Sequence, residues 1–148
     1  PSSIEFTLLI NHLIDLKQGR PVEMPVYSYV TSARAKETVT VNPAKVVILE
    51  GILILTHKTV RDITDICIFV DADADDRLMR IIRRDIIKRG RDYEEALHHY
   101  ERFVKPMHQQ FIEPTKRFAD VIVPQGGNNR VAIDMIISNI KVKLTEKQ

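Results

Sequence analysis

Residues 68–92 read IFVDADADDRLMRIIRRDIIKRGRD, and the interpretation of the whole chain starts from this stretch. An apolar run at its beginning predicts a strand that ends at Asp71. The pattern then takes a helical period of about 100° per residue. Four cations share one side of the predicted helix: Arg77, Arg80, Arg84 and Lys88. Apolar side chains share the opposite side: Leu78, Met79, Ile82 and Ile86.

The helix and the turn after it carry an unusual concentration of positive charge. Seven cations fall between Arg77 and Arg91, and Asp85 is the one acid among them. An exposed helix face usually mixes the two signs at i,i+4 spacing. Gly90 is placed to end the helix, so Arg89 and Arg91 are expected on a turn. Two interpretations stay open, a solvated basic helix and a lid that closes on phosphate.

The rest of the chain alternates strand and helix patterns, which predicts an α/β fold with a parallel sheet. Continuous apolar runs predict buried strands at 45–49, 67–70 and 121–123. Helices are expected at 4–17, 93–111 and 130–144, the first capped by Ser3. Alternating runs at 26–30 and 37–41, joined by a turn at 31–36, predict a hairpin.

Glu50 follows the first of these buried strands and precedes Gly51. Ligands of open α/β sheets bind at the carboxyl ends of the strands, so this carboxylate is a candidate ligand-binding group. A capping role in the next turn is equally open.

Composition narrows the class of protein. The length of 148 residues and the 44% hydrophobic content predict a single domain with a real core. A net charge of +2 argues against a general nucleic-acid binder. The single cysteine, Cys67, favours a reducing environment. The sequence contains no run long enough to span a membrane, so we expect a cytoplasmic protein with neither membrane nor nucleic acid as partner.

Several segments together resemble the uridine kinases (uridine–cytidine kinases) of the P-loop kinase group. Besides 68–92, the resemblance is carried by PVYSYVTSARAKETV at 25–39, VVILEGILIL at 46–55, FVKPMHQQFIEPTKRFADVIVPQGG at 103–127 and VAIDMIISNIK at 131–141. It implies a three-layer parallel-sheet P-loop kinase fold with a projecting hairpin at about 26–41 and a helical lid at about 75–92. The implied reaction is phosphorylation of uridine or cytidine to the 5′-monophosphate in pyrimidine salvage, with ATP or GTP and Mg²⁺, by a homotetramer.

The resemblance also implies roles for individual residues. Glu50 matches an acid near Mg²⁺, and the loop 124–129 is similar to one that borders the donor adenine. The remaining roles are phosphate contacts for Arg84 and Arg89, nucleoside contacts for Tyr27, Tyr29 and Arg91, and donor-nucleotide contacts for Arg84, Gly126 and Asn128.

Three positions depart from the pattern of that family. Ser32 stands where the family has a histidine, Ile81 where it has a lid arginine, and His99 where it has a glutamine. Ser32 and His99 can still form hydrogen bonds to a nucleoside, whereas Ile81 cannot replace a cation. Base preference is therefore open.

The phosphate-binding loop G-x-x-x-x-G-K-[ST] does not occur in the 148 residues. We therefore interpret the chain as the C-terminal portion of a kinase, with its first strands missing and no expected turnover by itself. Two other functions are kept: a nucleotide-binding pseudo-enzyme or regulatory module of the same fold, and a basic-helix protein that binds nucleic acid.

Overall fold

The computed structural model describes residues 4–28 and 33–146, and the chain divides into two compact units, 1–63 and 64–148. Both units combine helices with short sheets, so the α/β class is confirmed. Ser3, Tyr29 and Ser32, which the sequence analysis singled out, lie outside the described residues. Within the described ranges, no helix is both long and apolar enough to cross a membrane.

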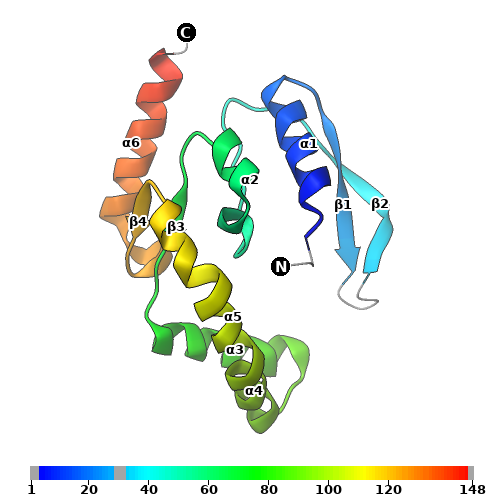
Figure 1. Cartoon of the computed structure of the whole chain (residues 1–148), viewed down its shortest axis with the longest axis vertical. Helices are drawn as coiled ribbons and strands as arrows, with labels where there is room; N and C mark the ends of the chain where they lie inside the picture. The colour runs from blue at the N-terminus through cyan, green and yellow to red at the C-terminus, as the bar shows by residue number, and fades with distance from the viewer. Residues whose placement is uncertain (1–3, 29–32, 147–148) are drawn as a thin grey trace. The chain divides into compact units, whose positions relative to one another are not determined.

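In the first unit, helix α1 (Phe6–Lys17) lies beside strand β1 (Val22–Ser28), as Figure 1 shows. The helix begins two residues later than expected, and its N-cap residue is Glu5, whose side chain forms no capping hydrogen bond. Leu16 is its buried residue. Gly19 has φ +78°, a conformation that favours glycine, and it turns the chain from the helix toward β1.

Strands β1 and β2 (Ala33–Val41) form an antiparallel hairpin in which Val22 faces Val41. The strands are longer than predicted: residues 33–36, expected in a turn, belong to β2. The register shifts between Pro25 and Tyr27. Proline has no N–H to donate to the ladder, which is a physical reason for an irregularity at this position.

The strand predicted at 45–49 is absent from the structure, and this prediction was wrong. Residues 42–50 form neither a strand nor a helix, and Ile48 is 84% exposed. A continuous apolar run forms a central strand only where neighbouring strands and covering helices are present, and no described strand pairs with it. The chain continues into the 3₁₀ turn η1 (Ile54–Thr56) and into α2 (Lys58–Ile63), a helix that the sequence analysis did not predict.

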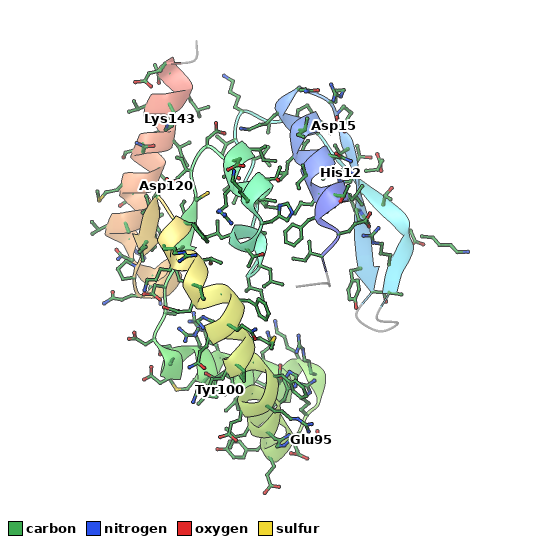
Figure 2. All side chains as sticks on the ribbon, in the orientation of Figure 1. His12, Asp15, Glu95, Tyr100, Asp120 and Lys143 are labelled. Carbon is green, nitrogen blue, oxygen red and sulfur yellow. The ribbon has the colours of Figure 1, made fainter. Side chains whose placement is uncertain are left out.

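The second unit contains a parallel pair of strands, β3 (Ile68–Val70) and β4 (Val121–Val123), drawn side by side in Figure 1. The Asp120 carboxylate, labelled in Figure 2, accepts the backbone N–H of Cys67 at 2.7 Å. Phe69 and Val123 are buried. Helix α3 (Ala74–Arg89) follows β3, and the turn η5 (Gly126–Asn128) with helix α6 (Arg130–Glu146) follows β4.

The long helix expected at 93–111 extends to residue 118 and changes its winding along the way. Asp92 caps its start by accepting the N–H of Glu95 at 2.8 Å. Two π-helical segments interrupt it, η2 (Tyr100–Val104) and η3 (His108–Ile112). The other segments are α4 (Tyr93–His99), α5 (Lys105–Met107) and the 3₁₀ segment η4 (Glu113–Phe118). A π turn holds one residue more than an α turn, so the side chains beyond it rotate around the axis.

The apolar side predicted for α3 is only partly covered. Leu78 and Ile82 are half-buried, but Met79 is 59% exposed. The fully buried residue of this helix is Asp85, which the sequence analysis treated as an interruption of the cationic side. Helix α6 has no buried residue.

Candidate functional site

Three arginines converge on the buried carboxylate of Asp85 at the end of α3. Oδ1 accepts Arg84 Nε at 3.0 Å and lies 2.9 Å from Arg84 Nη2 and 3.2 Å from Arg89 Nη1. Oδ2 accepts Arg91 Nη1 at 2.7 Å. We call these four residues the Asp85 cluster. It unites three of the residues for which the family resemblance implies phosphate or nucleoside contacts.

The local backbone explains how Arg91 reaches this carboxylate. Gly90 has φ +66°, so α3 ends in a left-handed residue. The backbone carbonyl of Asp85 accepts the N–H groups of Gly90 and, at 3.1 Å, of Arg91. These bonds turn the chain back over its last helical turn, and the side chain of Arg91 returns to Asp85.

The electrostatics of the cluster favour its charged form. Burial disfavours an ionised Asp85, but the hydrogen bond from Arg84 and the charges of Arg84, Arg89 and Arg91 outweigh it and hold the pKa of Asp85 below its usual value. Three guanidinium charges and one carboxylate leave a net charge of +2. The guanidinium side chains are 43%, 43% and 33% exposed, so an anion from solvent can reach them.

His99 belongs to the same surroundings. Burial first, and then the positive charge of Arg91, lower the pKa of the His99 imidazole. Its ring packs against Phe103 with a centroid distance of 5.4 Å. A neutral imidazole carries one donor and one acceptor, which suits a hydrogen bond to an uncharged partner.

A second charged group lies at the carboxyl end of β3. Lys116 Nζ donates to Asp71 Oδ2 at 2.6 Å. The carbonyl of Asp71 accepts the N–H of Gly126 at 2.8 Å, which ties the β3 end to the turn η5. The ion pair of Lys116 was not predicted from the sequence, because its partner lies 45 residues away and no local spacing connects the two residues.

The cationic stripe predicted on α3 divides into two groups in the structure. Arg77 donates to the carbonyl of Ala72, and Arg80 Nε donates to the carbonyl of Asp76 at 3.3 Å. Arg80 also lies close to Gly126, since a Cβ on this glycine would sit 3.7 Å from Arg80 Nη1. Arg84 lies apart from these two side chains, because it belongs to the Asp85 cluster at the other end of the helix.

A small cavity of about 80 Å³ lies between α3 and the interrupted helix that follows it. Its lining includes Ile81, His108 and Tyr100, the last labelled in Figure 2. Ile81 is the position where the resemblance calls for a cation. In this chain the apolar side chain of Ile81 occupies that position and lines the cavity.

The remaining candidates lie on other elements, outside the Asp85 cluster. Tyr27 lies on β1, is 51% exposed and faces Arg34 across the hairpin. Glu50 is exposed in the segment before η1. Gly126 and Asn128 form η5, where Gly126 is buried and Asn128 is exposed. Within residues 4–28 and 33–146, no group of three or more His, Cys, Asp or Glu side chains is placed to hold a metal ion. The predicted roles of these residues stay predictions.

The family model that matches this chain is described as the phosphoribulokinase/uridine kinase family, and it matches residues 1–132. The chain belongs to this family. Three similar proteins are named uridine kinase. The one from Staphylococcus carnosus is 47% identical over 148 residues, which are 100% of this chain and 71% of the relative, and the one from Halalkalibacterium halodurans is 49% identical over 147 residues, which are 99% of this chain and 70% of the relative. The one from Escherichia coli K12 is 51% identical over 140 residues, which are 95% of this chain and 66% of the relative. Membership in the phosphoribulokinase/uridine kinase family is thus shown over most of the chain.

Proposed function

We propose that the intact protein is a nucleoside kinase that transfers the γ-phosphoryl group of ATP or GTP to the 5′-hydroxyl of uridine or cytidine. The observation that carries this proposal is the Asp85 cluster, with its surplus of two positive charges at the end of α3. Phosphoryl transfer depends mainly on positioning and on neutralising charge on the phosphates. Guanidinium groups match phosphate oxygens as bidentate donors, so a cluster of three suits a polyphosphate.

The other residues have defined tasks in this proposal. Arg84 and Arg89 contact the phosphates, and α3 with its turn acts as a lid over them. Arg91 and His99 contact the nucleoside. In the hairpin, Tyr27 and Tyr29 supply aromatic walls for the base, and Ser32 offers a hydroxyl for a hydrogen bond to the nucleoside. The adenine of the donor lies against η5, at Gly126 and Asn128.

Glu50 fits a magnesium ligand in this arrangement. Mg²⁺ in kinases is commonly held by one or two carboxylates together with substrate phosphates and water, so a single exposed carboxylate is sufficient. When bound, the ion neutralises charge on the phosphates. Glu50 itself only holds and orients it.

We also propose that the overall architecture is the three-layer P-loop kinase fold and that the intact protein is a homotetramer. The 148 residues contain no G-x-x-x-x-G-K-[ST] loop, and we expect no turnover from them alone. Light scattering on the full-length protein tests the tetramer, and an assay of the 148-residue chain beside the full-length protein tests the second expectation.

The proposed reaction is tested by incubating the full-length protein with ATP and, separately, uridine, cytidine, thymidine or adenosine. Mass spectrometry should find UMP or CMP, with phosphate on the 5′-oxygen and an equal amount of ADP. Absence of both products in a folded, full-length sample contradicts the proposal.

A second candidate function is a nucleotide-binding module without turnover, favoured by Ile81 beside the small cavity. Such a protein would bind UTP or CTP more tightly than uridine. Calorimetry with both ligands on the full-length protein separates the two, because an acceptor site prefers the nucleoside.

A further inference from the structure

Asp85 is the one acidic or basic side chain that is buried among the described residues. Burying a carboxylate costs free energy unless the carboxylate is paired. Removing one member of a buried ion pair leaves the other charge without its partner and destabilises the surrounding structure. Among the described residues, its ion pairs run to one short segment, from Arg84 to Arg91. Asp85 therefore pairs with the arginines to which we assign contacts with the phosphates and the nucleoside.

The stoichiometry shows that Asp85 orders these arginines without neutralising them. A carboxylate offers about four lone-pair sites, whereas three guanidinium groups carry about fifteen N–H donors. Asp85 can thus engage only a part of the donors. The surplus of positive charge stays on side chains that are between 33% and 43% exposed.

The backbone of the same residue also holds the turn that carries Arg91. Its carbonyl oxygen accepts the N–H groups of Gly90 and Arg91, so the turn and the side chains are held from one point. Without the carboxylate, three like charges would repel one another, and each arginine would regain rotamer freedom that costs free energy to order again.

We propose that Asp85 is the positioning residue of the kinase site, which holds Arg84 and Arg89 ready for the transferring phosphoryl group, and Arg91 ready for the nucleoside, before the substrates arrive. This inference rests on the proposed function. It adds a residue that touches neither substrate and acts through three others. Its contribution is orientation of donors ahead of the transition state, the property on which electrostatic catalysis depends.

The test compares Asp85→Asn and Asp85→Glu in the full-length protein with the matched controls Asp75→Asn and Asp75→Glu. Asp75 is exposed on the same helix and outside the cluster. We expect kcat to fall about 10- to 100-fold in Asp85→Asn, the size seen when groups that orient a ligand's partners are removed. The KM for uridine should change less than kcat, and both controls should stay within about twofold.

A double-mutant cycle separates positioning from a merely structural role. If Asp85 acts through Arg84, the variant Arg84→Gln/Asp85→Asn should lose little more activity than Arg84→Gln alone. Independent, additive losses overturn the proposal. So does wild-type kcat in the folded fraction of Asp85→Asn.

Asp85→Glu keeps the charge but moves the carboxylate by one methylene, so it decides the question if Asp85→Asn does not fold. Wild-type kcat in folded Asp85→Glu overturns the proposal, and an approximately tenfold loss supports it. If the wild-type protein phosphorylates neither uridine nor cytidine, the proposed function fails by itself. Binding of inorganic tripolyphosphate then tests the cluster alone: about tenfold weaker binding by Asp85→Asn supports positioning, and unchanged binding contradicts it.

Discussion

Asp71 and Lys116 form an ion pair at the carboxyl end of β3, and each changes the acidity of the other. The hydrogen bond from Lys116 is the largest cause that lowers the pKa of Asp71 below its usual 3.8. The hydrogen bond to Asp71 is the largest cause that raises the pKa of Lys116 above its usual 10.5. Charge pairing therefore stabilises the fold above the unfolded pKa of Asp71 and below that of Lys116.

Replacing Lys116 by methionine should lower the urea midpoint of unfolding at pH 7. The difference from wild type should shrink as the pH falls below 3.8, because Asp71 of the wild-type protein becomes protonated and loses its charge pairing with Lys116. Urea titrations between pH 2 and pH 7 measure this, with Lys105→Met as the control. A difference that stays constant over this range would show that the pair is not its cause.

Arg84 and Arg83 are neighbours on α3 with different surroundings, which makes them a matched pair for testing phosphate contact. Arg84 joins the Asp85 cluster, whereas Arg83 is an exposed side chain with no assigned role. We expect Arg84→Gln to lower kcat/KM for ATP about 100-fold, as loss of a donor to a developing charge does in other enzymes. Arg83→Gln should change it less than about twofold. Equal effects in steady-state assays would assign the cations a general electrostatic role.

The Asp85 cluster shows which contacts spacing can predict. Arg89 lies at i+4 from Asp85, and an ion pair at this spacing can be anticipated on any helix. Arg91, at i+6, meets Asp85 only because the chain reverses at Gly90. The turn at Gly90 was predicted, but the return of the Arg91 side chain to Asp85 was not. The reason is that burial of an acid such as Asp85 depends on the packing around it.

At the scale of elements, the C-terminus of α3 depends on one glycine. Gly90 has φ +66°, and a Cβ at this position would meet nothing within 4 Å. The cost of Gly90→Ala is therefore conformational and should be about 1 kcal/mol in the free energy of unfolding. Gly127→Ala is the control, since Gly127 also has open space and lacks the left-handed φ. Chemical denaturation measures both, and equal losses would exclude a backbone cause.

Elements with a local signature could be predicted, and those that depend on distant partners could not. The pattern at 74–90 contains its own helical period and its terminating glycine, Gly90. The run at 45–49 has the composition of a buried strand, but strand formation requires a partner, and no described strand pairs with it. The π segments η2 and η3 follow from one extra residue per turn, which hydrophobic spacing does not record.

At the scale of the whole molecule, residues with proposed roles occur in both compact units. Glu50 and Tyr27 belong to residues 1–63, and the Asp85 cluster belongs to residues 64–148. Spacing within either unit does not assign these residues to one function, and that assignment came from the family resemblance alone.

Glu50→Gln tests the contribution of the first unit. Loss of the carboxylate should raise the Mg²⁺ concentration needed for half-maximal activity about tenfold, because an amide oxygen is a weaker ligand for this hard cation. Glu37→Gln, an exposed acid on β2, should leave it unchanged. An unaltered Mg²⁺ requirement in Glu50→Gln would remove Glu50 from the site.

A crystal structure of the full-length protein with ADP and uridine tests the central claim most directly. We predict guanidinium nitrogens of Arg84 and Arg89 within about 3 Å of phosphate oxygens, with Asp85 still bound to the same side chains. If both guanidinium groups lie more than about 6 Å from every phosphate oxygen, the cluster does not serve the phosphates and the account is contradicted.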